Sequence, residues 1–263
     1  PDIGGVLQCI MLLGDTGCGF EHQLASIDRA LGADGALPST NADFLRPEAL
    51  LVIIILSNED DCSAPADTML YSLNGGMQNI TNPLGPVANY RCNQFGHLCT
   101  DPGSGAVISP PLIFPSDAQG TTAAPTLDLT SCTSNDTNGL LTPVARFVSD
   151  IRALKSDPDN QIVVGAVIAP PSPYTVQWVK AIGGQNSPPG ELWPQMEHSC
   201  GPAGAVNPEA TSLSSDGSFG DPGVRIAQFV GAFPKSHLGS ICDVSYGPVL
   251  GGVVADIGKV ISP

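Results

Sequence analysis

The sequence predicts an α/β fold, with a doubly wound, mostly parallel sheet flanked by helices. Ala49–Leu56 and Gln161–Ala169 are apolar runs rich in β-branched residues, which indicates strands covered on both faces. Segments with apolar residues at helical spacing precede and follow these runs. The 263 residues include 30 Gly and 25 Pro, so long irregular loops are expected around a compact core.

The N-terminal part of the chain is predicted to form strand, helix and strand. Val6–Leu13 is a short apolar run typical of a buried strand. A helix follows, because apolar residues recur at helical spacing at Phe20, Leu24, Ile27 and Leu31. Ala49–Leu56 is the next strand. This order describes a βαβ unit, whose natural outcome is a parallel sheet.

Residues from about 63 to 140 show no sustained periodicity and are rich in Gly, Pro, Asn, Ser and Thr. A structureless stretch of this length is unusual inside a compact domain. We therefore expect an irregular excursion, held in place by disulfides, within a single domain that covers residues 1–263.

The C-terminal part continues the alternation of helices and strands. Thr142-Pro143 opens a helix, and Gln161–Ala169 is a second buried strand. Loops are expected at Pro170–Pro173 and Ser187–Pro194. Two further helices are predicted, one beginning after Asp221-Pro222 and one over Tyr246–Ile261.

Charge and hydropathy exclude several classes of partner. The chain has 25 acidic and 10 basic residues and a net charge of −15, so it would repel the phosphates of nucleic acids. Its longest apolar run is far too short to cross a bilayer, so no transmembrane segment is predicted. The expected partner is another protein or a surface assembly.

The eight cysteines are all disulfide candidates, because no CxxC pair is present: Cys9, Cys18, Cys62, Cys92, Cys99, Cys132, Cys200 and Cys242. Oxidised pairs indicate a secreted or cell-surface, extracytoplasmic location. Cys92 and Cys99 are close enough in sequence to close a small loop. Cys200 and Cys242 flank a predicted helix and are candidates to bridge its ends.

Acidic and polar residues follow the Ala49–Leu56 strand at once, at Ser57, Asn58, Glu59, Asp60 and Asp61. Ligands of parallel sheets sit beyond the carboxyl ends of the strands. Hard oxygen ligands there favour Ca²⁺ or Mg²⁺. The alternative interpretation is a solvated acidic loop.

Common catalytic motifs are absent from the sequence. Asp15-Thr16-Gly17 matches the aspartic-protease signature, but no second D-[TS]-G supplies the other aspartate. There is no G-x-S-x-G, HExxH, P-loop or GxGxxG. A non-catalytic protein is therefore expected.

Several segments carry a family resemblance that covers nearly the whole chain. They include Gly17-Cys18-Gly19-Phe20-Glu21, Phe44-Leu45-Arg46, Glu59-Asp60-Asp61-Cys62-Ser63, Tyr90-Arg91-Cys92, His198-Ser199-Cys200 and Ile241-Cys242. In order and spacing, the chain resembles the secreted von Willebrand factor A-like proteins of the myxobacterial type. The resemblance implies a doubly wound sheet with a metal-ion-dependent adhesion site.

That site combines a D-x-S-x-S loop, a Thr and a strand-tip Asp, and this sequence departs from all three. D-x-S-x-S is absent, Thr16 is the hydroxyl nearest the Thr position, and Asn58 stands at the Asp position. The implied metal ligands of this degenerate site are Asp15, Thr16, Asn58, Glu59, Asp60 and Asp61. The family's first strand and helix would lie upstream of Pro1, so an upstream segment or a neighbouring chain is expected to cover a sheet edge.

The two site loops each carry a cysteine, which motivates a Cys18–Cys62 bond as a hypothesis. Cys9–Cys18 with Cys62–Cys132 is an equally open alternative.

The resemblance implies adhesion or protein–protein interaction at a bacterial surface. Binding would use Gly14–Gly19, Ser57–Asp61 and Pro170–Tyr174. One alternative is a structural subunit of a surface assembly. Another is a metal-dependent hydrolase that uses Asp15, Asp60 and Asp61.

Overall fold

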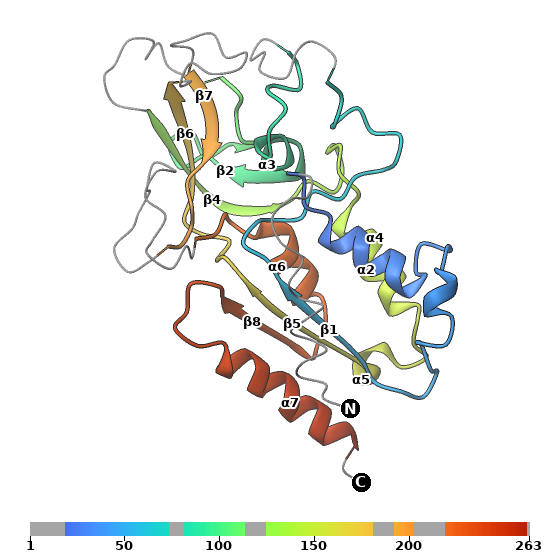
Figure 1. Ribbon diagram of the computed structural model, residues 1–263. Helices are drawn as coiled ribbons and strands as arrows, with labels where there is room; N and C mark the ends of the chain where they lie inside the picture. Colours follow the sequence, from blue (N-terminus) through green and yellow to red (C-terminus); the bar gives the residue numbers. More distant parts are fainter. Residues whose placement is uncertain (1–18, 74–81, 114–124, 181–191, 202–218, 262–263) are drawn as a thin grey trace.

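The computed structural model describes residues 19–73, 82–113, 125–180, 192–201 and 219–261, and all structural statements below refer to these residues. They form two sheets (Figure 1). A three-stranded parallel sheet has the order β1-β5-β8, and a five-stranded antiparallel sheet has the order β3-β2-β4-β6-β7. The mixed α/β class and a parallel sheet are therefore confirmed.

The parallel sheet consists of β1 (Leu51–Leu56), β5 (Ile162–Ile168) and β8 (Ser236–Ser240). The central strand β5 pairs with β1 from Leu51 opposite Ile162, and with β8 from Val164 opposite Ser236. All seven residues of β5 are buried. The prediction of a strand covered on both faces is confirmed for β5.

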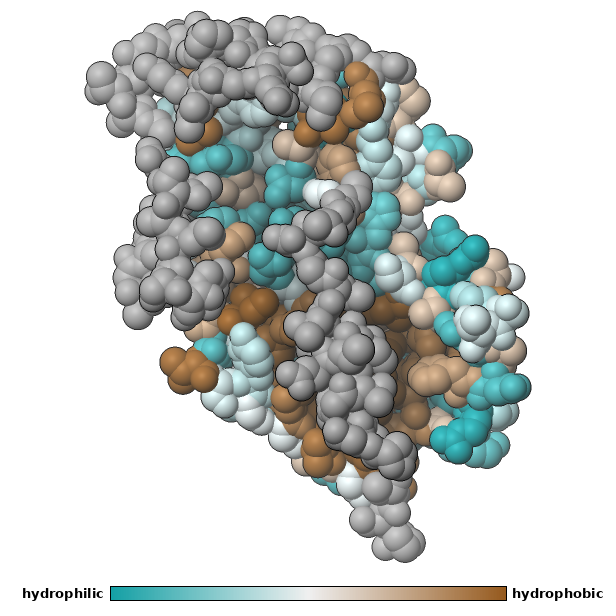
Figure 2. All heavy atoms as spheres, in the orientation of Figure 1, coloured by the Kyte–Doolittle hydropathy of each residue, from teal (hydrophilic) through white to brown (hydrophobic). Residues whose placement is uncertain are grey.

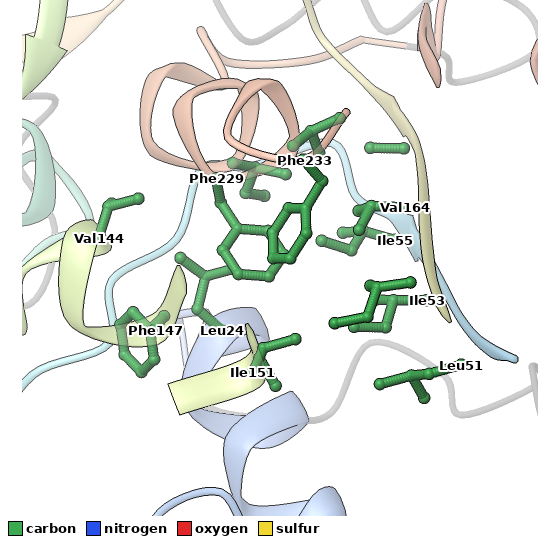
Figure 3. Close-up of a cluster of buried hydrophobic side chains, with 14 of the residues drawn as sticks. Leu24, Leu51, Ile53, Ile55, Val144, Phe147, Ile151, Val164, Phe229 and Phe233 are labelled. Atoms are coloured by element: carbon green, nitrogen blue, oxygen red, sulfur yellow. The ribbon is translucent and has the colours of Figure 1, made fainter. Parts of the chain in front are cut away.

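Helices cover both faces of the parallel sheet. On one face, α2 (Gln23–Leu31), α4 (Val144–Arg152) and α6 (Val224–Gly231) share one core with β1 and β5. Figure 3 shows Leu24, Ile151 and Phe229 converging from these three helices. On the other face, α7 (Gly247–Ile261) contacts β5 and β8. The four helices confirm the helical segments expected from periodicity.

Strand β1 differs from its prediction. Leu51, Ile53 and Ile55 are buried, whereas Ile54 is 55% exposed and Leu56 is 48% exposed. The expectation that this run is covered on both faces is therefore wrong. The physical reason is that α7 packs on β5 and β8, and among the described residues no helix packs closely on the matching face of β1.

The second sheet is antiparallel, so a mostly parallel architecture is wrong. Its strands are β2 (His97–Thr100), β3 (Val107–Ile108), β4 (Thr126–Ser134), β6 (Tyr174–Lys180) and β7 (Leu192–Met196). It has its own apolar core around Tyr174, Val176 and Trp178. A doubly wound sheet of the von Willebrand type stays a prediction.

The segment around residues 63–140 contains regular structure. It includes α3 (Tyr90–Gly96), β2, β3 and β4. The expected loop over Ser187–Pro194 is also wrong at its end, because residues 192–194 belong to β7. Short helices complete the fold at η1 (Ser39–Asn41) and α5 (Pro158–Gln161). The predicted strand Val6–Leu13 lies outside the described residues.

Disulfides are confirmed, with three pairings in the described part of the chain. They are Cys62–Cys92, Cys99–Cys132 and Cys200–Cys242. The first joins the loop after β1 to α3, and the second joins β2 to β4. The third joins the segment after β7 to the one after β8, so the predicted Cys200–Cys242 bond is confirmed.

The other predicted pairings that involve described cysteines are wrong. Cys62 bonds to Cys92, which excludes both Cys18–Cys62 and Cys62–Cys132. The local Cys92–Cys99 loop is excluded for the same reason, since Cys99 is bonded across two strands to Cys132. Cys9 and Cys18 lie outside the described residues.

In the described ranges, no helix has the length and apolar character to span a membrane.

Candidate functional site

The loop after β1 lies at the carboxyl edge of the parallel sheet, as the sequence predicts. Its first residue, Ser57, donates its backbone N–H to the carbonyl of Val167 on β5, at 3.2 Å. The side chain of Gln23 on α2 donates to Ser57 Oγ at 2.7 Å. The loop is thus fixed both to the sheet and to the first turn of α2.

Asp61 caps the N-terminus of α2 and is fully buried. Its Oδ1 accepts the backbone N–H of Leu24 at 2.9 Å and the hydroxyl of Ser63 at 2.6 Å. Ser63 Oγ in turn accepts the backbone N–H of Ala25 at 3.0 Å. Two otherwise unpaired amides at the start of the helix are satisfied in this way, next to the positive end of its dipole.

Asp60 plays the same part for α6. Its Oδ2 accepts the backbone N–H of Arg225 at 2.8 Å, and its Oδ1 accepts that of Ile226 at 3.1 Å. Oδ2 also lies 2.8 Å from His97 Nε2, and His97 Nδ1 lies 2.8 Å from the hydroxyl of Tyr174. Burial acts to raise the pKa of Asp60, but the bond and charge of His97 and the contacts of Arg225 outweigh burial and lower it.

Arg225 connects the two sheets and has no exposed surface. Its guanidinium donates to Asp61 Oδ2 through Nη2 at 3.0 Å and Nε at 3.2 Å. It also donates to Ser134 Oγ on β4 at 2.8 Å and to the carbonyl of Thr142 at 2.7 Å. A buried charge needs a partner of opposite sign and hydrogen bonds. The Asp61–Arg225 pair meets both needs.

A small pocket lies beside this network. The residues that line it are Glu21, Glu59, Asp60, Cys62, Asn89, Cys92, Asn93, His97 and Asp221. Among the described residues, no Lys or Arg forms an ion pair with Glu21, Glu59 or Asp221, three of the carboxylates that line it. The imidazole of His198 lies 2.6 Å from Asp221. Negative charge therefore gathers at the carboxyl edge of the sheet.

Burial and this negative charge together raise the pKa of Glu59. Burial, followed by the negative charges of Asp221 and Glu21, raises it to about 6. Hydrogen bonding by Asn89 and the charge of His198 act in the opposite direction but are smaller. Glu59 is consequently anionic at neutral pH and loses its charge near pH 6.

The predicted metal ligands are distributed unevenly around the pocket. Glu59 and Asp60 line it, whereas Asp61 is enclosed by its own hydrogen bonds. Asn58 bonds through its backbone carbonyl to the N–H of Asp221, at 2.8 Å. Asp15 and Thr16 lie outside the described residues. Within the ranges that the structure describes, no three His, Cys, Asp or Glu side chains are placed to hold a metal ion.

Sequence reasoning did not assign His97, His198, Asp221 or Arg225 to this network. The histidines carry no motif, and Asp221 is predicted only to precede the helix that begins after Pro222. Asp60 and the backbone N–H of Arg225 are 165 residues apart in the chain. No local pattern in the sequence indicates a contact between residues so far apart in the chain. Tyr174, at the end of the predicted Pro170–Tyr174 loop, instead begins β6 and is buried.

Comparison with known proteins adds nothing to this assignment. No protein-family model, no curated protein and no solved structure matches the chain. The resemblance to the von Willebrand factor A-like proteins therefore stays a prediction from the sequence.

Proposed function

We propose that this chain is an extracytoplasmic, von Willebrand factor A-like protein-interaction domain without catalytic activity. Its binding surface is the acidic rim at the carboxyl edge of the parallel sheet, around Glu59 and Asp221. The observation that carries the proposal is the grouping of Glu21, Glu59 and Asp221 around one small pocket, where no described Lys or Arg forms an ion pair with them. Such a pocket favours a cationic group from outside the chain.

The chemistry of the partner follows from the pocket. A Lys or Arg side chain of a protein partner would meet Glu59 and Asp221 and relieve their mutual repulsion. Ca²⁺ or Mg²⁺ would serve the same purpose through carboxylate oxygens. Asn58, Glu59 and Asp60, with Asp15 and Thr16 from outside the described residues, are the proposed ligands of such an ion. The three disulfides support the extracytoplasmic location.

The hydrolase alternative has less support from the geometry. Asp60 and Asp61 would be its central carboxylates, but each is already bonded to a helix N-terminus and to a cationic side chain. A carboxylate used in this way is a weak base towards water.

Selection of peptides from a displayed library on the immobilised chain tests the proposal. We expect recovered peptides to be enriched in Lys and Arg and to bind less tightly as pH falls through about 6, where Glu59 gains a proton. Glu59→Gln should weaken binding about tenfold or more, since hydrogen bonds to charged groups contribute roughly 1.5–3 kcal/mol. Asp128→Asn, on β4, is the matched control.

Two results would contradict the proposal. One is a selection with no enrichment of basic residues. The other is binding that Glu59→Gln leaves unchanged at neutral pH. Calorimetric titration of the same variants with CaCl₂ and MgCl₂ separates a bound ion from a basic side chain as the cationic group.

A further inference from the structure

The peptide bond between Asp221 and Pro222 lies beside a histidine, at the carboxyl edge of the parallel sheet. The same dipeptide occurs at Asp101-Pro102 and Asp157-Pro158. A carboxylate is an established nucleophile in covalent catalysis. In an Asp-Pro dipeptide it is positioned to attack its own backbone carbonyl, and the proline nitrogen leaves as a secondary amine. Whether such a bond breaks depends on the groups around the carboxylate.

The carboxylate of Asp221 contacts an imidazole. His198 Nδ1 lies 2.6 Å from Asp221 Oδ1, and the two side chains are only 17% and 13% exposed. The ring of His198 packs on that of Phe219, with 4.4 Å between their centroids. When it is protonated, His198 therefore holds an acidic proton next to the peptide bond of Pro222. The pair combines a nucleophile with a general acid.

The other two Asp-Pro carboxylates have no histidine bonded to them in the described part of the chain. Asp101 accepts hydrogen bonds at both oxygens, from the backbone of Gly103 at 2.9 Å and the hydroxyl of Ser104 at 2.6 Å. Asp157 is exposed and accepts the side-chain amide of Asn160 at 2.9 Å. These two bonds are therefore internal controls for the chemistry of Asp221.

The backbone is fixed on both sides of the bond. The N–H of Asp221 donates to the carbonyl of Asn58 at 2.8 Å, and the N–H of Gly223 donates to that of Ala169 at 3.4 Å. Pro222 between them is buried. The carboxylate and the carbonyl carbon that it would attack are thus held in a restricted arrangement. Intramolecular reactions gain much of their rate in this way.

Water has a place next to the same carboxylate. The pocket that Asp221 and Glu59 line has a volume of about 10 Å³, which is close to the space that one water molecule needs. Carboxylate and amide groups around it provide hydrogen-bond partners. Figure 2 shows hydrophilic residues gathered at mid-height of the view, where the two sheets meet. The surroundings suit a hydrolytic step.

We propose that the chain cleaves its own Asp221-Pro222 bond. The side-chain carboxylate of Asp221 attacks the backbone carbonyl carbon of the same residue and forms a cyclic anhydride. The bond from this carbon to the nitrogen of Pro222 breaks, and the nitrogen takes a proton from the imidazolium of His198. Water then opens the anhydride to two carboxylates on Asp221. The two protons released in this step go to His198 and to the new amine, so the sum is hydrolysis of one peptide bond.

The fragments stay joined after cleavage. The Cys200–Cys242 disulfide has one cysteine on each side of the broken bond. Strand β8 also remains paired with β5. The new amine of Pro222 brings a positive charge next to Asp221, beside carboxylates that have no Lys or Arg ion pair among the described residues. The reaction occurs once per molecule and does not depend on the proposed binding function.

Intact-mass spectrometry of the full chain before and after reduction tests the proposal. The protein is incubated at about pH 6, near the usual pKa of histidine. Without reductant we expect a single species that is heavier than the uncleaved chain by one water molecule. After reduction we expect two fragments, residues 1–221 and 222–263. With hydroxylamine present, the first fragment should carry a hydroxamate on Asp221, which identifies the anhydride and excludes a contaminating protease.

Variants assign the roles of the two side chains. Asp221→Ala should slow cleavage about a thousandfold or more, because it removes the intramolecular nucleophile. His198→Gln should slow it about a hundredfold, which is within the range for loss of a general acid. His237→Gln is the matched control, since it removes a histidine that lies 2.9 Å from Asp256, and it should cleave at the wild-type rate.

Four results would overturn the proposal. They are a chain that stays intact after reduction, equal cleavage at Asp157-Pro158, fragments without the hydroxamate, and a folded His198→Gln variant that cleaves at the wild-type rate. Circular dichroism shows whether the variant is folded. If it is not, the hydroxylamine experiment on the wild-type chain decides.

Discussion

Asp28 is expected to destabilise the fold at neutral pH, and Asp28→Asn tests this directly. The residue lies on α2, is only 3% exposed, and its Oδ1 has no hydrogen-bond partner in the described part of the chain. Burial, followed by the negative charge of Asp150, raises the pKa of Asp28 from 3.8 to about 7. Arg146 acts to lower it, and Asp34 acts to raise it further.

The sign and size of the effect follow from linkage. A carboxyl group whose pKa is higher in the folded than in the unfolded state does not destabilise the fold at pH values below its pKa in the unfolded state. Stability is then lost as pH rises from about 4 to about 7. A shift of about three units corresponds to ~4 kcal/mol as an upper limit. We expect about half of this, since the polar Asn is also buried without a full set of partners.

Denaturant unfolding of the oxidised protein at pH 5 and pH 8 measures the effect. Asp28→Asn should raise the free energy of unfolding by roughly 2 kcal/mol at pH 8 and by clearly less at pH 5. Asp43→Asn changes an exposed aspartate on a loop and should alter stability by less than about 0.5 kcal/mol at either pH. An equal gain at both pH values, or a loss of stability at pH 8, would refute the reasoning.

Two further predictions concern the anchors of the acidic loop. Arg225→Leu should lower the free energy of unfolding by about 3–5 kcal/mol, because it leaves Asp61 as a buried charge without its ion pair. The double variant Arg225→Leu with Asp61→Asn should recover part of that loss in the same assay. Replacing Cys62 and Cys92 by Ala should cost roughly 2–4 kcal/mol in chemical denaturation, since their bond closes a chain segment with a sequence separation of 30. An unchanged midpoint in either experiment would show that the loop is held by other contacts.

The parallel half of the fold could be predicted because its elements carry strong local signals. Strand β5 is an apolar run that lies between helical segments in the sequence. Thr142-Pro143 comes directly before α4, which begins at Val144. The antiparallel half gave no such signal. Strand β4, for example, has the sequence TLDLTSCTS, in which Thr and Ser alternate with few large apolar residues. Cross-strand pairing and the Cys99–Cys132 bond hold it in place, and neither is visible in a local window.

The candidate site was predictable in position but not in its chemistry. The end of β1 placed the acidic residues at the carboxyl edge, as parallel sheets require. Which carboxylates remain accessible to a partner depends on where the N-termini of α2 and α6 lie in the folded chain. The N-termini of α2 and α6 both point at the loop, and only the folded chain brings α6 there, from more than 160 residues away.

Three consecutive acidic residues therefore differ in what they do. Asp61 neutralises Arg225 and caps α2, and Asp60 caps α6 and bonds His97. Each accepts several hydrogen bonds, and these bonds attach the loop to the N-termini of α2 and α6. Among the described residues, no Lys or Arg forms an ion pair with Glu59, and its neighbours Glu21 and Asp221 carry the same sign of charge. The anchored pair thus fixes Glu59 in an anionic pocket, which is the arrangement expected of a preorganised binding surface.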